Sequence, residues 1–228
     1  MVKSWWSAEL RKLLKGSDYM QGSAQREIDT VVFDLGRVLI HWDPYGYMVE
    51  KFGEDVAKRL MERVFNVPEW NLMDKGEISE AQLWRIMEER YPEDAQYIRH
   101  MKNAVLSLLK PIEENVSLLP SLKVHGYRLC VLSNFSYKSF EYVYNTFEFF
   151  KYFDCMVISS HVKKIKPNED IFYELMERCG VKPSTSLFID DRADNIETAI
   201  RLGFNVIHLT EYGKLKEKLE EVLKMELY

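Results

Sequence analysis

From residue 127 onward, short apolar segments alternate with segments of helical periodicity. The apolar segments are YRLCVLS, CMVISS, TSLFIDD and NVIHLT, and the amphipathic ones are SYKSFEYVYNTF, NEDIFYELMERCG, ADNIETAIRLG and KLKEKLEEVLKM. A regular strand–helix order is typical of a parallel sheet with helices on both faces. A further apolar segment at about 29–34 ends in the sequence VVFD. We therefore predict an α/β fold with a Rossmann-like parallel sheet.

Between the first strand and this alternating region lies a long stretch with a different pattern. Residues 44–118 contain several helical periodicities, such as SEAQLWRIMEERY, and no convincing strand. Within it, Gly76 breaks one helix and Ser79 is the expected N-cap of the next. Residues 1–27 are separate again: KSWWSAELRKLLKG has helical spacing and a linker-like segment follows. We expect a helix that docks on the domain or on a partner subunit, with a membrane-surface helix as the alternative.

Composition limits the classes of partner. The 228 residues carry a net charge of −5, so no basic excess is present to neutralise nucleic-acid phosphates. No apolar run reaches membrane-spanning length. Cys130, Cys155 and Cys179 stand far apart without a CxxC pair, and we interpret them as apolar core residues rather than ligands. Their number suits a reducing compartment, and we predict a soluble cytoplasmic protein without a nucleic-acid or membrane partner.

Polar side chains follow three of the expected strands. Asp34 ends the first strand, Ser133 and Asn134 end the second, and Asp190 and Asp191 end a later one. Each alone is equally compatible with an ordinary turn or a helix cap. In a parallel sheet, however, the carboxyl ends of the strands meet at one edge, where ligands bind beside the switch in strand order. The sequence therefore predicts one constellation.

The chemistry of this constellation is specific. Carboxylates from separate strands can hold Mg²⁺, which prefers oxygen ligands. Lys166, in KKIKPNEDIF, adds a cation just before a helix. Together with hydroxyl, amide and backbone N–H groups, such a site can bind a phosphoryl group, and one carboxylate can attack phosphorus. This set of residues predicts phosphoryl chemistry.

The order of these motifs resembles the haloacid dehalogenase (HAD) superfamily of hydrolases. The matching segments are FDLGRVL, VLSN, Lys166-Pro167 and FIDDRADN. MDKGEISEAQLWRIMEE is similar to cap sequences of the phosphatase domain of soluble epoxide hydrolase, and FDLG with FIDDRADNIE resembles α-D-glucose-1-phosphate phosphatase. The resemblance implies an α/β core at 28–41 and 119–228, a small α-helical cap at 42–118, and an extension at 1–27 that is a possible interface.

The resemblance also assigns metal ligands. It implies that Asp34 is the nucleophile and the first Mg²⁺ ligand. It implies that the backbone carbonyl of Gly36 is a second ligand. Asp191 would bind Mg²⁺ directly, and Asp190 would do so directly or through water. The implied cofactor is Mg²⁺.

The remaining motif residues are implied to bind the substrate. Ser133 and Asn134 would contact the phosphate, and Lys166 would bridge Asp34 and the phosphate. The implied activity is hydrolysis of a small phosphorylated metabolite, for example a sugar phosphate, through an aspartyl-phosphate intermediate. Which metabolite is bound, and the oligomeric state, are not predicted.

One position departs from the family pattern Asp-x-Asp, whose second Asp is the general acid. Here that position is Gly36, followed by Arg37. Asp43 and His41 are the nearby groups that could donate a proton, and we expect neither to replace the missing Asp fully. Two alternatives remain: a metal-independent 2-haloacid dehalogenase, which the paired acids at 190–191 disfavour, and an impaired family member that acts as a binding or regulatory protein.

Overall fold

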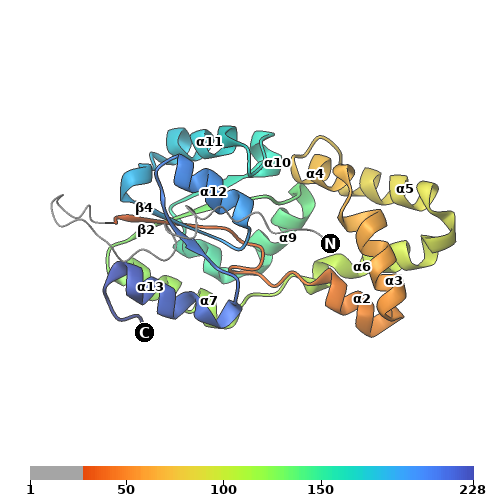
Figure 1. Cartoon of the computed structure of the whole chain (residues 1–228), viewed down its shortest axis with the longest axis horizontal. Coiled ribbons are helices and arrows are strands. Elements are labelled where there is room, and N and C mark those ends of the chain that lie inside the picture. The colour runs from red at the N-terminus through yellow and green to blue at the C-terminus, as the bar shows by residue number, and fades with distance from the viewer. Residues whose placement is uncertain (1–27) are drawn as a thin grey trace, which may run out of the picture.

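The computed structural model describes residues 28–228, so the expected helix at 1–27 lies outside the described residues. Five parallel strands form one sheet in the order β3-β2-β1-β4-β5 (Figure 1). The strands are β1 (Thr30–Phe33), β2 (Arg128–Ser133), β3 (Cys155–Ile158), β4 (Ser186–Asp190) and β5 (Asn205–His208). The predicted α/β fold with a parallel sheet is confirmed.

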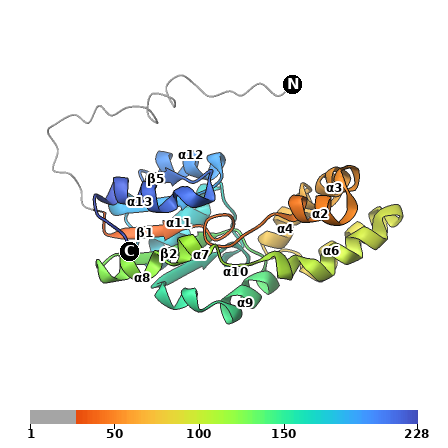
Figure 2. The same cartoon turned by 90° about the horizontal axis from the view of Figure 1, so that it is seen from below.

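Helices cover both faces of this sheet, as the strand–helix alternation predicts (Figures 1 and 2). The helices of the core are α7 (Glu113–Val116), α8 (Leu119–Val124), α9 (Tyr137–Thr146), α10 (Ser159–Val162), α11 (Glu169–Cys179), α12 (Ala193–Arg201) and α13 (Leu215–Leu223). Short 3-10 turns lie at Glu148–Tyr152, Pro183–Thr185 and Tyr212–Lys214. No helix in the described part of the chain combines the length and hydrophobicity needed to cross a membrane.

Alternate residues of each strand pack against different helices because successive side chains point to opposite faces of a sheet. Val31 and Phe33 of β1 belong to a cluster that includes residues of α8, α9 and α13. Val32, between them, belongs to a second cluster with residues of α11 and α12. Both faces of the central strands are buried, which explains why these strands read as continuous apolar runs.

The helical insert forms a separate body beside the sheet, at the right of Figure 1. Its helices are α2 (Pro44–Phe52), α3 (Glu54–Leu60), α4 (Pro68–Asp74), α5 (Glu80–Arg90) and α6 (Ala95–Leu108), with a π turn at Met61–Phe65 and a 3-10 turn at Pro92–Asp94. As expected, Ser79 caps α5: its hydroxyl accepts from the Gln82 N–H, and Gln82 accepts from the Ser79 N–H. The insert has its own apolar core between Met48 and Val105.

The end of this insert is set by packing. Val116 and Leu118 join the sheet's own core cluster rather than the core of the insert. The carbonyl oxygen of Lys110 accepts from the His41 N–H (2.8 Å), so the segment that enters the insert lies next to the segment that leaves it. The division of the chain at residues 42 and 118 remains a proposal, and these contacts favour an earlier end, near Leu109.

The prediction that all three cysteines are free core residues is wrong for two of them. Cys155 and Cys179, expected to be core thiols, form a disulfide with a Cα–Cα distance of 5.7 Å. Cys155 begins β3 and Cys179 ends α11, and α11 packs on that face of the sheet. The two residues are distant in sequence and become neighbours only through this packing. Cys130 is free and buried, as expected.

Candidate active site

Strand register brings the expected site residues together at the carboxyl edge of the sheet. Phe33 pairs with Ile189 on one side, and the Asp34 N–H donates to the carbonyl oxygen of Ile189 (2.9 Å). Asp34 therefore lies beside Asp190. On the other side, β1 pairs with β2, which ends at Ser133. Because β1 lies between β2 and β4, the side chains of Asp34, Ser133 and the acids that follow β4 meet at one point of the sheet edge.

The ammonium group of Lys166 contacts two of the carboxylates in this cluster. Its ammonium Nζ lies 3.0 Å from Asp34 Oδ1 and 2.6 Å from Asp190 Oδ2, and it donates to the carbonyl oxygen of Leu132 (2.9 Å). The side chains of Lys166 and Asp190 are at most 1% exposed, and that of Asp34 is 10% exposed. Burial makes these contacts strong, because water neither competes for them nor screens the charges.

One ammonium between two carboxylates leaves an excess of negative charge. Burial raises the pKa of Asp34 to about 7; Lys166 opposes this rise, and Asp190 and Asp191 add to it. Burial by itself would lower the pKa of Lys166, but attraction to Asp190 and Asp34 outweighs this and the net shift is upward. Lys166 is therefore a cation. The ionised form of Asp34 is disfavoured, because one ammonium group does not compensate for burial and the neighbouring carboxylates.

Asp190 and Asp191 differ in how many donors they already have. Both oxygens of Asp190 accept from the Asn195 side-chain amide (3.0 Å each), and Oδ1 also accepts from the Arg192 N–H. Asp191 keeps an 18% exposed side chain, with one ion pair to Arg37 at 3.1 Å. Burial and the charge of Asp190 raise the pKa of Asp191, whereas Arg37 opposes the rise. The oxygens of Asp190 are thus already hydrogen-bonded within the protein, whereas Asp191 is more accessible to a ligand.

The donor set fits a hard divalent cation. Ligand oxygens of Asp34, Asp190 and Asp191 lie within 4.8 Å of one another. All three are carboxylates, as Mg²⁺ prefers, and the excess negative charge on Asp34 would be relieved by a divalent ion. The carbonyl of Gly36, which the family resemblance implies as a further ligand, stays a proposal.

Ser133 and Asn134 have different environments. The Ser133 hydroxyl is fully buried and lies close enough to Asp34 to lower its pKa, yet it has no hydrogen bond of normal geometry. A buried polar atom without a partner is costly unless a ligand satisfies it. The Asn134 amide instead donates to the Lys166 carbonyl and accepts from the Lys166 N–H, both at 2.9 Å. Its side chain positions Lys166, so a phosphate contact by Asn134 remains a proposal.

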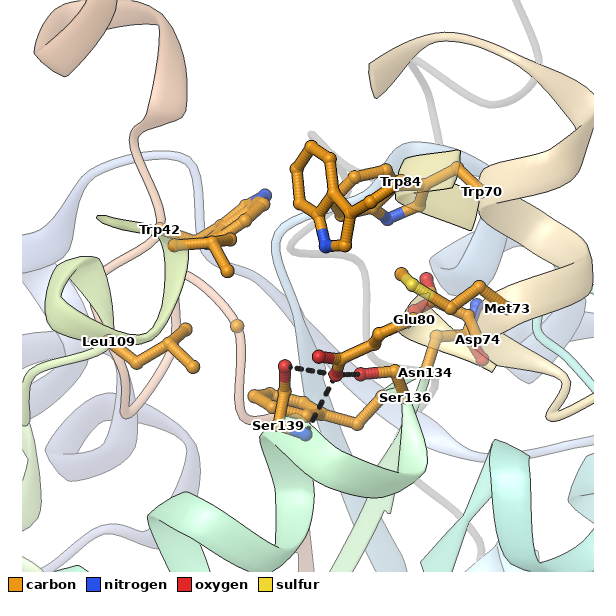
Figure 3. A pocket seen from close by; sticks show the side chains of 13 residues that line it. Trp42, Trp70, Met73, Asp74, Glu80, Trp84, Leu109, Asn134, Ser136 and Ser139 are labelled. Atoms are coloured by element: carbon orange, nitrogen blue, oxygen red, sulfur yellow. Dashed lines mark hydrogen bonds between the residues drawn. The ribbon is translucent and has the colours of Figure 1, made fainter. Parts of the chain in front are cut away.

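A pocket of about 100 Å³, partly open to solvent, adjoins this cluster and extends under the helical insert (Figure 3). From the core side it is lined by Gly36, Asn134, Phe135, Ser136 and Ser139. From the insert side it is lined by indole and aliphatic side chains: Trp42, Trp70, Met73, Trp84, Val105 and Leu109. The carboxyls of Asp74 and Glu80 also line it. Two independent sets of elements, the sheet edge and the insert, therefore enclose one cavity.

Comparison with known proteins identifies the family. A profile described as haloacid dehalogenase-like hydrolase matches residues 29–209. The chain belongs to this family. That its helical insert is the family's cap stays a proposal. The finer resemblance to α-D-glucose-1-phosphate phosphatase stays a prediction.

Individual relatives agree with this assignment of a HAD-like hydrolase. The chain is 25% identical over 200 residues to a phosphorylated carbohydrates phosphatase of Thermotoga maritima, which covers 82% of this chain and 89% of the relative. A predicted HAD-like hydrolase of Porphyromonas gingivalis superposes with a TM-score of 0.67 at 27% identity, covering 87% and 99%. A magnesium complex of a HAD enzyme of Bacteroides thetaiotaomicron gives 0.58 at 25% identity, covering 79% and 92%. The chain spans 36% of the length of a further relative, the drimenol cyclase of Aspergillus calidoustus.

Two residues of this hydrolase that sequence reasoning missed join the cap to the core. One carboxylate oxygen of Glu80, Oε1, accepts from the hydroxyl of Ser136 and from the N–H (2.9 Å) and hydroxyl (2.7 Å) of Ser139 at the start of α9 (Figure 3). The Asp74 carbonyl accepts from the Ser159 hydroxyl. Asp74 lies within the MDKGEIS segment and Glu80 directly follows it, and no spacing in the sequence indicates that this segment contacts residues more than fifty positions away.

Asp43 and His41, the two groups considered as proton donors in place of the missing Asp, lie outside the pocket. The Asp43 carboxylate accepts from the Gly46 N–H (2.9 Å) as the N-cap of α2. His41 is exposed and its ring packs against Tyr212 at 5.4 Å. Neither lines the pocket, whereas Trp42 between them does. Asp74 is the pocket carboxyl with no side-chain hydrogen bond in the described part of the chain, and it replaces Asp43 as the candidate donor.

Asp74→Asn should make the hydrolase more stable at pH 8 than the wild type. Burial, then Glu80 and Asp34, raise the pKa of Asp74 to about 7 from 3.8. Between these values the unfolded chain loses the proton and the folded chain keeps it, so stability falls as pH rises. Because the side chain retains some exposure, we expect about 1–2 kcal/mol at pH 8 and nearly none at pH 4.

Chemical denaturation of the metal-free protein across this pH range measures the effect. Glu77→Gln, an exposed carboxylate on the same turn, is the matched control and should not change the pH dependence of stability. Identical pH profiles for the wild type and Asp74→Asn would contradict the assignment of a raised pKa to Asp74.

Proposed function

We propose that this hydrolase is a Mg²⁺-dependent phosphomonoesterase that acts through an aspartyl-phosphate on Asp34. The observation that carries the proposal is the combination at one sheet edge of three clustered carboxylates, a buried lysine and an unsatisfied buried hydroxyl. A carboxylate nucleophile, a cation and a free donor around one cavity are what transfer of a phosphoryl group requires.

Asp34 is oriented for attack by its own neighbours. Its Oδ1 accepts from the Leu35 N–H (2.8 Å) and faces Lys166, which leaves Oδ2 as the attacking oxygen. Formation of the oxygen–phosphorus bond breaks the ester bond, and the leaving alkoxide takes a proton from water or from Asp74, the candidate donor, and leaves as the alcohol toward the pocket. Water then cleaves the acyl phosphate, releasing inorganic phosphate and restoring the carboxylate. Ser133 and Lys166 would bind phosphate oxygens in both steps.

Asp34 and Asp191 would hold the metal, with Asp190 as support. When bound, Mg²⁺ would neutralise negative charge on the phosphoryl oxygens and favour the ionised form of Asp34. Asp190 fixes Lys166 and Asn195, so it shapes the site mainly through these contacts. The names of two similar proteins, a phosphorylated carbohydrates phosphatase and a magnesium complex of a HAD enzyme, support this reading.

The direct test is turnover of p-nitrophenyl phosphate by the full chain with Mg²⁺ and with EDTA. We expect hydrolysis that depends on Mg²⁺. Chloride release from 2-chloropropionate, independent of metal, would instead establish a dehalogenase. Bound Mg²⁺ and phosphate with no turnover of any ester would establish a binding protein.

Asp191→Asn should weaken Mg²⁺ binding by at least about 10-fold and leave the fold intact, because a carboxylate ligand of a hard cation loses its charge. Isothermal calorimetry of Mg²⁺ binding measures this, with circular dichroism as the check on folding. Asp194→Asn is the matched control: Asp194 lies three residues away, pairs with Arg192, and is not part of the carboxylate cluster. Unchanged Mg²⁺ affinity in Asp191→Asn would show that Asp191 is not a ligand.

Gly36→Asp should reduce the dependence of turnover on the leaving group. A Cβ added at Gly36 has no atom within 4 Å, so the cavity has space for the carboxyl that the family pattern places there. General acid catalysis is worth roughly 10²–10⁴-fold, and we expect a gain of about 10-fold or more for alcohols of high pKa and little for acetyl phosphate.

A Brønsted series of aryl phosphates on the wild type, Gly36→Asp, Asp43→Asn and Asp74→Asn measures the leaving-group slope. The steepest slope is expected for proteins without a positioned acid. A shallow wild-type slope that becomes steep only in Asp74→Asn would show that Asp74 already acts as the acid. A shallow slope that becomes steep in Asp43→Asn would assign that role to Asp43.

A further inference from the structure

The composition of the pocket between the sheet edge and the helical insert points to one kind of substrate. All three tryptophans in the described part of the chain, Trp42, Trp70 and Trp84, line it. Their rings follow one another at centroid distances of 6.0 Å (Trp42 to Trp70) and 6.2 Å (Trp70 to Trp84). Figure 3 shows them together across the cavity from Ser136 and Ser139. They form a continuous indole wall contributed by three separate segments of chain.

The polar groups of the pocket offer little to a sugar. Glu80 Oε1 is occupied by three donors from Ser136 and Ser139, and these serines are thereby occupied in turn. The Asn134 amide is occupied by the backbone of Lys166. In the described part of the chain, the pocket carboxyl oxygens without a hydrogen bond are those of Asp74 and Glu80 Oε2. They are too few for the several hydroxyl groups of a sugar, which would lose more hydrogen bonds to water than they regain.

The charges of the pocket also exclude a second anionic group. Asp74 and Glu80 line it, and no lysine, arginine or histidine is among its lining residues. The cation of this site, Lys166, is buried and committed to Asp34, Asp190 and the reacting phosphate. An alcohol carrying a carboxylate or another phosphate would meet two carboxyls and no counter-charge.

We infer that the alcohol part of the substrate is an uncharged, apolar ring system that stacks on the indole wall. Gly36, two residues after Asp34, and Asn134, next to Ser133, line the pocket, so an ester bound at Asp34 would direct its alcohol into it. This inference rests on the proposed phosphatase function and narrows its substrate class.

A matched pair of substrates tests the inference. 2-Naphthylmethyl phosphate and glucose 6-phosphate are both esters of primary alcohols, so their leaving groups differ mainly in apolar surface. We expect kcat/KM to be at least about 10-fold higher for the naphthyl ester, since aromatic stacking and burial both favour it. A 6-carboxy derivative of the naphthyl ester should lose most of this advantage. Equal or higher kcat/KM for glucose 6-phosphate or glucose 1-phosphate would overturn the inference.

Variants locate the effect in the pocket. Trp70 is only partly buried, and Trp70→Ala should lower kcat/KM for the naphthyl ester by about 10-fold or more. Acetyl phosphate, which has no ring to stack, should be affected much less. Tyr97→Ala is the matched control because Tyr97 is a partly buried cap aromatic that packs on Phe52 outside the pocket. An equal loss on both substrates in Trp70→Ala, or the same selectivity change in Tyr97→Ala, would contradict the inference.

A binding measurement separates this inference from the proposed function. Calorimetric titration with 2-naphthalenemethanol, the dephosphorylated product, needs neither Mg²⁺ nor turnover. We expect binding to the wild type that weakens in Trp70→Ala and persists in Tyr97→Ala, with no heat from glucose at the same concentration. Binding of the alcohol without turnover of acetyl phosphate would refute the phosphatase and retain the apolar pocket. Turnover of acetyl phosphate without binding of the alcohol would refute the apolar substrate alone.

Discussion

Asp34→Asn should abolish hydrolysis of every phosphate ester, by about 10⁴-fold or more in kcat. An amide cannot attack phosphorus, and no other group in the described residues lies in its place between Lys166 and Ser133. The fold should survive, because the Asn oxygen can still accept from the Leu35 N–H. Above pH 7 the variant should be at least as stable as the wild type, since burial disfavours the ionised Asp34.

Steady-state kinetics with p-nitrophenyl phosphate and acetyl phosphate measures the loss. Acid quenching of wild-type turnover followed by mass spectrometry should reveal a phosphate adduct on the peptide that contains Asp34, absent in Asp34→Asn. Asp29→Asn, an exposed acid at the opposite end of β1, serves as the control and should retain full activity. Substantial turnover by Asp34→Asn, or an adduct on another peptide, would assign the nucleophile elsewhere.

Lys166→Met should be the most destabilising single substitution proposed here, by about 3–5 kcal/mol in the free energy of unfolding. Met fills a similar volume but leaves Asp34 and Asp190 facing each other and the Leu132 carbonyl unpaired. Without the ammonium, the pKa of Asp34 rises further, so the loss should be largest at high pH and smaller near pH 5.

Urea denaturation of the metal-free protein at both pH values measures this loss. Asp34→Asn in the Lys166→Met background should recover part of the stability, because it removes one of the opposed carboxylates. Lys164→Met is the matched control: Lys164 pairs with Glu174 near the surface and should cost less than about 1 kcal/mol. Equal losses in the two lysine variants, or no recovery in the double variant, would contradict the central role of Lys166.

The parallel sheet was predictable because its determinants are local. Each strand of the core is a short apolar run and each helix has its own amphipathic period, so alternation alone indicates the topology class. Asp34, Ser133, Asp190 and Asp191 could be nominated together for the same reason: they end strands, and parallel strands end at one edge. Lys166 follows no strand: the sequence indicated only a cation just before a helix, and its role of bridging Asp34 and the phosphate came from the resemblance to the family.

The pocket could not be predicted because its residues share no local signal. Trp42 leaves the core, Trp70 lies in α4 and Trp84 in α5, and each segment reads as an ordinary amphipathic element. Only the packing of the cap over the sheet turns their rings toward one cavity. The same holds for Asp74, whose raised pKa follows from burial under that packing rather than from its neighbours in sequence.

The sequence by itself thus determined the class of fold, the edge of the sheet where chemistry gathers and the absence of the usual second Asp at Gly36. These features depend on residue type, order and strand polarity, which are local. The tertiary structure alone decided that Cys155 bonds to Cys179, that Arg37 pairs with Asp191 and that three tryptophans line one pocket with Gly36 and Asn134. Such pairings depend on which distant surfaces bury each other, and that is set by the packing of the whole chain.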